Sequence, residues 1–168
     1  MALLESRADG PVILEDRYQR LDETAPIPAT GAILVSLARF TAEHETLVAR
    51  PHPLGVWLAS NEQPGALAGA LDRLALVALD FPVFSDGRAF STARLLRERY
   101  GYKGELRAIG DVLCEQLPFM LRSGFDTFDM KSPKALEEFR AVVGEVRVVY
   151  QPTGDGRPTA IDRRLGRR

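Results

Sequence analysis

From residue 31 onward, the apolar and polar positions predict an alternation of short buried strands and amphipathic helices. Short, mostly apolar runs of four to six residues are typical of strands that are covered on both faces of a parallel sheet. Between these runs, apolar residues recur at spacings of three and four, as they do on one face of a helix. The strands are expected at residues 32–35, 55–59, 76–81, 105–109, 127–130 and 146–150.

Proline and glycine mark where the predicted helices begin and end. Pro51 stops the first helix, and Pro64 stands where a first helical turn tolerates proline. Gly124 favours the end of the fourth helix, which opens at residues 110–111. Pro118 should kink or divide that helix, because proline lacks a backbone donor.

Six strand–helix units with short links predict a single α/β domain with a mainly parallel sheet. The chain has 168 residues, whereas a closed eight-stranded β/α barrel takes about 250. We therefore expect an open sheet or an incomplete β/α barrel. We predict that residues 1–30 form an irregular N-terminal arm, that residues 31–150 form the α/β domain, and that residues 151–168 form a basic tail without fixed structure.

The amino-acid composition limits the classes of partner and the cellular compartment that we expect for this protein. Lys and Arg number 22 against 23 Asp and Glu, so no overall charge attracts the protein to nucleic acid or to an anionic membrane. One cysteine rules out an intrachain disulfide and fits a reducing compartment. No signal-peptide pattern and no apolar run of about 20 residues is present. We expect a soluble, cytoplasmic protein without a nucleic-acid or membrane partner.

Motifs for familiar cofactors and catalytic sites are missing from the sequence. It contains neither G-x-G-x-x-G nor G-x-x-x-x-G-K-[ST], so a dinucleotide or P-loop site is unsupported. No histidine–carboxylate pair has zinc spacing, and Cys114 alone cannot hold an iron–sulfur cluster. A G-x-S-x-G elbow is also lacking. The cofactor and the catalytic residues stay unknown at this level.

Ligands of parallel α/β sheets bind beyond the carboxyl ends of the strands, which directs attention to three loops. Residues 84–88, 110–111 and 130–132 each lead into a helix, whose N-terminus favours an anion. Several arginines follow nearby in the sequence and could bind an oxyanion. The candidate oxyanion-binding residues are Ser85, Asp86, Gly87, Arg88, Arg94, Arg107, Gly110 and Asp111.

Each of these residues also has a purely structural interpretation. Ser85, Asp86 or Asp111 could simply cap a helix. The arginines could form a solvated helix face paired with Glu98.

The central part of the chain resembles a known bacterial family. Residues 80–91 (DFPVFSDGRAFS), 93–97 (ARLLR), 104–108 (GELRA), 110–113 (GDVL) and 122–126 (RSGFD) are similar to the family called domain of unknown function 934. The resemblance runs from about residue 13 to 150 and adds Gln116 to the candidate residues. Ser123 departs from it, because the resemblance implies a cysteine there. If that cysteine has a chemical role in the family, Ser123 argues against a thiol mechanism in this chain. Members are described as "probable oxidoreductases involved in sulfite reduction".

Three hypotheses follow. The resemblance implies an accessory protein of assimilatory sulfite reduction that acts with a sulfite reductase haemoprotein as a docking or electron-path component. The second is a small enzyme or sensor that binds an oxyanion of sulfur metabolism, with Arg88 and Arg107 holding the charge. The third is a structural domain that forms a homodimer through an exposed sheet edge or the N-terminal arm.

Overall fold

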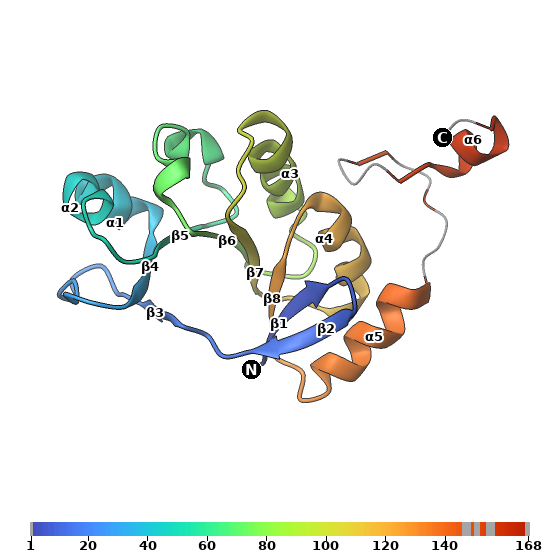
Figure 1. Ribbon diagram of the computed structural model, residues 1–168, viewed down its shortest axis with the longest axis horizontal. Helices are drawn as coiled ribbons and strands as arrows, with labels where there is room; N and C mark the ends of the chain where they lie inside the picture. Colours follow the sequence, from blue (N-terminus) through green and yellow to red (C-terminus); the bar gives the residue numbers. More distant parts are fainter. Residues whose placement is uncertain (1, 146–148, 150–151, 154–156, 167–168) are drawn as a thin grey trace.

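The computed structural model describes residues 2–145, 149, 152–153 and 157–166 (Figure 1). Its strands form one eight-stranded sheet in the order β2-β1-β8-β7-β6-β5-β4-β3. The strands are β1 (Ala2–Arg7), β2 (Gly10–Leu14), β3 (Tyr18–Arg20), β4 (Ala32–Ser36), β5 (Leu54–Leu58), β6 (Leu76–Phe81), β7 (Glu105–Gly110) and β8 (Thr127–Met130).

Helical segments follow the parallel strands and connect them. Figure 1 shows that the helices between β4 and β8, together with α5, form an arc on the outside of the sheet. They are α1 (Leu37–Ala42), α2 (His44–Val48), η1 (Pro64–Leu67), η2 (Leu71–Arg73), α3 (Arg88–Arg94), η3 (Leu95–Arg99), η4 (Cys114–Gln116), α4 (Leu117–Ser123), α5 (Ala135–Glu145) and α6 (Ala160–Arg164). None of the helices in the described part of the chain is both long and apolar enough to cross a membrane.

The α/β class is confirmed, but the prediction of a mainly parallel sheet holds only in part. Strands β3 to β8 pair in parallel, as the strand–helix alternation predicts. Strand β1 pairs antiparallel with both β2 and β8, so the sheet is mixed. A tight turn before Gly10, where φ is +121°, joins β1 to β2 without the helix that a parallel pair needs. The pairing of β1 with β8 joins segments that are far apart in the sequence, so the strand–helix alternation did not predict it.

The N-terminal residues take part in the sheet instead of forming an irregular arm. They supply β1, β2 and β3, and the sheet has β2 at one edge and β3 at the other. A flat sheet of eight strands would place its edges about 34 Å apart. Residues 15–17 join those two edges, yet the chain from Leu14 to Tyr18 spans at most about 14 Å. The sheet therefore has to curl, and the incomplete barrel is the better of the two predicted architectures.

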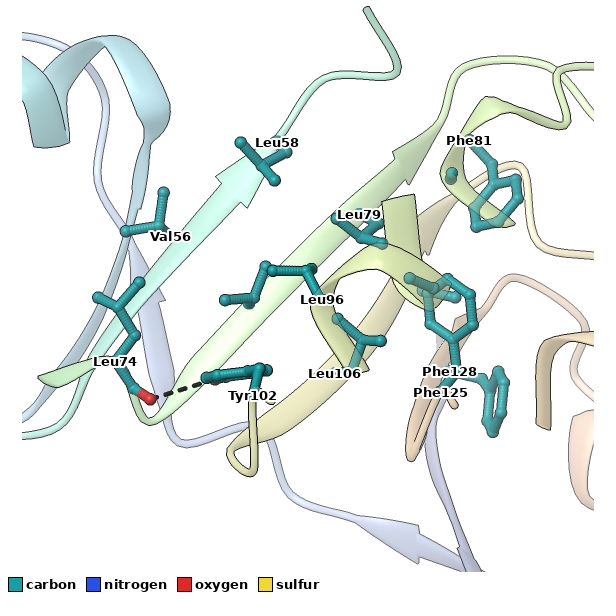
Figure 2. Packing of buried hydrophobic residues seen from close by; sticks show 14 of the residues in the cluster. Val56, Leu58, Leu74, Leu79, Phe81, Leu96, Tyr102, Leu106, Phe125 and Phe128 are labelled. Carbon is teal, nitrogen blue, oxygen red and sulfur yellow. Dashed lines mark hydrogen bonds between the residues drawn. The ribbon is translucent and has the colours of Figure 1, made fainter. Parts of the chain in front are cut away.

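Alternating side chains divide the sheet into a convex, helix-covered face and a concave face. Figure 2 shows the packing on the convex face, where Val56, Leu79 and Leu106 meet Leu96 of η3. Tyr102 belongs to the same core, and its hydroxyl donates to the Leu74 carbonyl at 3.1 Å. A second, smaller cluster occupies the opposite face and contains Tyr18, Leu34, Leu76, Ala78 and Ile109.

Strand boundaries match the sequence prediction better than helix boundaries do. The strands expected at 76–81 and 127–130 are observed with those bounds. The helix expected after Pro64 is two short 3₁₀ segments, η1 and η2. Pro118 stands in the first turn of α4, directly after η4, so the predicted division of this helix is confirmed. Gly124 ends α4 with a φ of +100°.

The C-terminal predictions can be compared only in part. Most of the strand expected at 146–150 lies outside the described residues, although Val149 is buried and bridges to Thr159. Within the tail expected to lack fixed structure, residues 160–164 form α6. The Thr159 hydroxyl caps this helix by accepting from the Asp162 N–H.

Candidate functional site

A cavity of about 340 Å³ with charged side chains in its lining lies on the concave face, toward the carboxyl ends of the parallel strands. Ligand sites of α/β folds are usually found at this end of the sheet. The cavity is lined by Asp16, Tyr18, Arg20, Leu34, Asp80, Arg107, Ile109, Gly110, Asp129 and Lys131.

Strand alternation explains why charged side chains reach this cavity. In β6, Leu79 and Phe81 belong to the helix-covered core, so Asp80 points to the concave face. Phe128 and Met130 of β8 place Asp129 there in the same way.

The strand register sets how far apart the two carboxyl groups lie. Asp80 is level with Ile109, and the pairing of Ala108 with Phe128 brings Ile109 beside Asp129. Two strand spacings therefore separate Asp80 from Asp129, about 10 Å between their Cα atoms.

Arg107 is the buried cation under the cavity. Its side chain is 4% exposed, and its Nη1 and Nη2 lie 2.9 Å from Asp16 Oδ2 and 2.8 Å from Glu105 Oε1. Thr127 Oγ1 donates to the same Glu105 oxygen at 2.7 Å, and the guanidinium carbon lies 5.4 Å from the centre of the Tyr18 ring. Two carboxylates thus neutralise Arg107 and hold its side chain in place.

Asp80 and Asp129 are the partly buried carboxyl groups of the cavity, and neither forms a hydrogen bond or an ion pair with any described residue. Burial raises the pKa of Asp80, against the opposing charges of Arg20 and Lys131 and with a further increase from Asp86. Burial also raises the pKa of Asp129, where Arg107 and Lys131 oppose the shift and Asp16 adds to it.

Tyr18 adds a buried polar atom without a partner. The residue is 7% exposed, and its Oη has no hydrogen-bond partner among the described residues. Burial is the main reason why the pKa of its phenol is raised, and the neighbouring Arg17 side chain acts in the opposite direction through its charge and its polar contact with the phenol. The hydroxyl oxygen has almost no surface that the cavity can reach, so the rest of the Tyr18 side chain, and not its hydroxyl, lines the cavity.

Two further cations stand at the rim of the cavity. The Arg20 guanidinium stacks over Trp57, with its carbon 4.6 Å from the ring centre. It makes no ion pair within the described part of the chain, so its planar donors stay available. Lys131 Nζ lies 3.7 Å from Asp111 Oδ1, and its side chain is 64% exposed.

The predicted oxyanion-binding residues do not converge on one site. Arg107 and Gly110 line the cavity. Arg94 pairs with Glu98 on an exposed helix surface. Ser85 and Gly87 are exposed in the loop before α3.

Asp86 and Arg88 neutralise each other within this loop. Arg88 Nη2 lies 2.6 Å from Asp86 Oδ2 and donates to Ser60 Oγ at 2.8 Å. Hydrogen bonds from the Arg88 side chain, then from Ser60, hold the pKa of Asp86 well below its usual range. The charge of Arg88 is thus already compensated by a carboxylate from its own loop.

Asp111 and Gln116 support the loop between β6 and α3. Phe84 N–H donates to Asp111 Oδ2 at 3.0 Å, and Gln116 Nε2 donates to the Phe84 carbonyl at 2.9 Å. These contacts fix the backbone of an exposed segment in which Val83 and Phe84 are 54% and 59% exposed.

Other residue types that bind cofactors form no cluster that the structure describes. In the described ranges, no three His, Cys, Asp or Glu side chains gather as metal ligands would. Cys114 is partly buried, and this burial is the main cause of its raised thiol pKa.

Of the ten residues that line the cavity, two are candidates predicted from the sequence, Arg107 and Gly110, and Lys131 lies in one of the three predicted loops, at residues 130–132. Two of the residues that were not predicted had a readable signal. Asp80 and Asp129 interrupt otherwise apolar strands at positions that alternation assigns to one face. Tyr18 and Arg20 gave no comparable signal, because strand β3 joins the sheet through a long-range pairing with β4. Lys131 is exposed and follows β8 directly.

The curled sheet, its outer helices and the cavity at the strand ends define an α/β protein of half-barrel shape with a site lined by charged side chains on its concave face. The chain belongs to the family described as bacterial protein of unknown function (DUF934), whose model matches residues 55–161. This confirms the family resemblance seen in the sequence. No curated protein matches the chain. Asp80, Arg107 and Asp129 lie within the matched residues, while Tyr18 and Arg20 precede them.

Proposed function

We propose that this protein binds a small molecule carrying an oxyanion in its concave cavity. The observation that carries the proposal is Arg20, a cavity-lining guanidinium that has no ion pair with the residues described. Stacking on Trp57 restricts the movement of the guanidinium. A planar guanidinium held in this way suits a sulfate, sulfonate or carboxylate group, which can accept two parallel hydrogen bonds.

Other residues of the cavity support this chemistry. Lys131 supplies a second positive charge at the rim. Asp80 and Asp129 have pKa values raised by burial, so they can exchange protons nearer to neutral pH than an exposed carboxyl can. The cavity can therefore bind an oxyanion and can also exchange protons with it.

Sulfur metabolism is the part of the proposal that rests on the family resemblance, whose members are described in connection with sulfite reduction. Sulfite and sulfate are the simplest oxyanions of that chemistry and are the first ligands to test.

Isothermal titration calorimetry at low ionic strength provides the test, because salt screens a binding site at a protein rim. We expect sodium sulfite or sodium sulfate to bind, and Arg20→Ala to weaken binding by about tenfold or more, since a charge-assisted hydrogen bond is lost. Arg140→Ala removes an exposed cation from α5, outside the cavity, and should leave the affinity unchanged. Equal affinities for wild type and Arg20→Ala would contradict the proposal.

A second function, docking on a sulfite reductase haemoprotein, is favoured by the loop between β6 and α3. We propose that Val83 and Phe84 contact this partner, so that the protein acts as an accessory component of sulfite reduction. Large exposed apolar residues on a fixed backbone suit a protein interface, because little conformational entropy is lost on binding.

Affinity purification of the tagged protein from its native host, with haem absorption as the readout, tests this function. We expect the haemoprotein to co-purify with wild type and to be lost with Phe84→Ser. Ile13→Ser is the matched control, because Ile13 is 60% exposed on β2, at the edge of the sheet. Absence of haem from the wild-type eluate, or its retention with Phe84→Ser, would exclude docking through this loop.

A further inference from the structure

We infer that the ligand of the concave cavity is a zwitterion, whose ammonium group lies at Asp80 and Asp129 and whose oxyanion lies at Arg20. This inference rests on the proposed function of the cavity and names the class of its ligand.

The first observation is the charge balance of the lining. Arg20, Arg107 and Lys131 face an equal number of carboxylates, Asp16, Asp80 and Asp129. Arg107 is already neutralised by Asp16 and by Glu105 beneath it. A simple oxyanion bound at Arg20 would therefore add negative charge beside Asp80 and Asp129. Their remaining nearby cation at the rim, Lys131, already pairs with Asp111.

The second observation is the spacing of those carboxyl groups. Asp80 and Asp129 lie on either side of Ile109, about 10 Å apart between Cα atoms. Neither has a hydrogen-bond partner among the residues that the structure describes. An ammonium group has three donors and a positive charge, so it can bond to these carboxylates and stabilise their ionised form.

The third observation is the apolar floor of the cavity. Leu34 and Ile109 line it, and both belong with Tyr18 and Ala78 to the small core of the concave face. A short aliphatic link between the two charged ends of a ligand would lie on this floor.

The volume fits a molecule of this class. At about 340 Å³, the cavity is at the lower end of the range for small-molecule sites. A ligand with a few carbon atoms between its charged groups is the expected size.

A matched pair of probes separates the zwitterion from a simple anion. 2-Aminoethanesulfonate and ethanesulfonate have the same sulfonate and chain, and they differ in the ammonium group alone. By calorimetry on the full chain at pH 7.5, we expect 2-aminoethanesulfonate to bind about tenfold or more tightly than ethanesulfonate or sulfate. Equal or weaker binding of 2-aminoethanesulfonate would overturn the inference, while binding of sulfate alone would leave the oxyanion proposal standing.

Variants locate the ammonium group. Asp80→Asn and Asp129→Asn should each weaken 2-aminoethanesulfonate binding by about tenfold and leave ethanesulfonate unaffected or slightly tighter. Asp72→Asn, an exposed carboxylate outside the cavity, is the control and should change neither affinity. If both cavity variants bind 2-aminoethanesulfonate as wild type does, the assignment of these carboxylates is wrong. Thermal melts of each variant verify that it is folded.

The pH dependence gives an independent readout. Ionised carboxylates attract ammonium, whereas protonated carboxyls can donate to a simple anion. As pH falls from 7.5 to 5, affinity for 2-aminoethanesulfonate should decrease and affinity for sulfate should increase. The opposite slope for 2-aminoethanesulfonate would overturn the inference. If none of the three probes binds at any pH, the proposed function of the cavity fails as well.

Discussion

Individual arginines in this chain have very different roles, although the sequence presents them as one cluster. Arg97 donates to the carbonyls of Tyr102, Gly104 and Gly124 at 2.8–2.9 Å. Its Nη2 also pairs with Asp126 at 2.5 Å. One side chain thus connects the helical segment η3 to the end of α4 and to the start of β8. A solvated helix face paired with Glu98 was one interpretation of the arginines in this stretch of sequence. It does not hold for Arg97, because spacing along one helix says nothing of carbonyls contributed by other segments.

Replacing Arg97 by alanine should destabilise the fold. The change leaves three carbonyls without this donor and Asp126 with the Leu106 N–H alone, which costs about 2–4 kcal/mol. For a chain of this length, a loss of that size lowers the melting temperature by about 4–16 °C, measurable by circular dichroism. Arg94→Ala is the matched control: it removes an exposed pair with Glu98 and should change stability by less than about 1 kcal/mol. Equal melting temperatures for the two variants would contradict this role of Arg97.

The carboxyl groups of the cavity should reduce the stability of the fold at neutral pH. Burial raises the pKa of Asp129 in the folded state, so the folded protein holds this proton more tightly than the unfolded chain does. The stability that this carboxyl contributes is present below its unfolded pKa and is lost as pH rises through the folded value.

Asp129→Asn should therefore stabilise the protein at pH 7, by less than about 1 kcal/mol after solvent screening, and have little effect at pH 4. Urea unfolding at the two pH values measures the difference. A variant that is less stable than wild type at pH 7 would show that this carboxylate is compensated within the fold. Stability sacrificed in this way is typical of groups retained for binding.

At the scale of elements, the end of β7 determines the shape of the cavity. Gly110 closes this strand with a φ of +92°. A Cβ at this position would lie 2.5 Å from Asp80 Oδ1 and 2.5 Å from the Phe81 carbonyl oxygen. The backbone of β7 thus approaches β6 so closely that the Asp80 carboxyl occupies the space where a side chain would stand.

Gly110→Ala should destabilise the protein by about 2 kcal/mol or more, because it combines left-handed strain with these contacts. Gly101→Ala separates the two effects. Gly101 also has a positive φ, +65°, but nothing lies within 4 Å of its added Cβ, so about 1–2 kcal/mol is expected from strain alone. Chemical denaturation compares the two variants, and a larger loss with Gly101→Ala would refute the close approach at Gly110. Ligand affinity should fall in Gly110→Ala alone, since Asp80 has to move.

At the scale of the whole molecule, the curl of the sheet brings its two edges together. Residues 15–17 cross from β2 to β3, and Asp16 of this crossing pairs with Arg107 in the middle of the sheet. Strand β6 is paired on both sides and is buried except at Asp80, whereas β3 has three residues and one paired side. The concave site therefore combines side chains from central strands that are paired on both sides with side chains from an edge strand that is paired on one side.

Hydrogen exchange measured by mass spectrometry should reflect this difference. We expect the slowest exchange in β6 and β7 and much faster exchange in β3, because opening β3 breaks few hydrogen bonds and exposes little buried surface. Ligand binding should slow exchange in β3, since Tyr18 and Arg20 would then contact a bound molecule. Equal protection of β3 and β6 without ligand would show that the curled edge is as stable as the centre.

The sequence by itself determined the α/β class, the positions of five of the strands and the divided helix at Pro118, because these depend on apolar periodicity and on backbone chemistry within a few residues. It also contained the family resemblance and two cavity residues that were named as candidates, Arg107 and Gly110. Asp80 and Asp129 were visible only as polar breaks in the apolar pattern of their strands and were not among the candidates. Only the tertiary structure decided the antiparallel β1, the edge strand β3 and the curl, since strand pairing between distant segments leaves no local signal. The concave cavity is a product of that curl: it unites Tyr18 and Arg20 from one edge with Asp80 and Asp129 from the centre, which no spacing along the chain could place together.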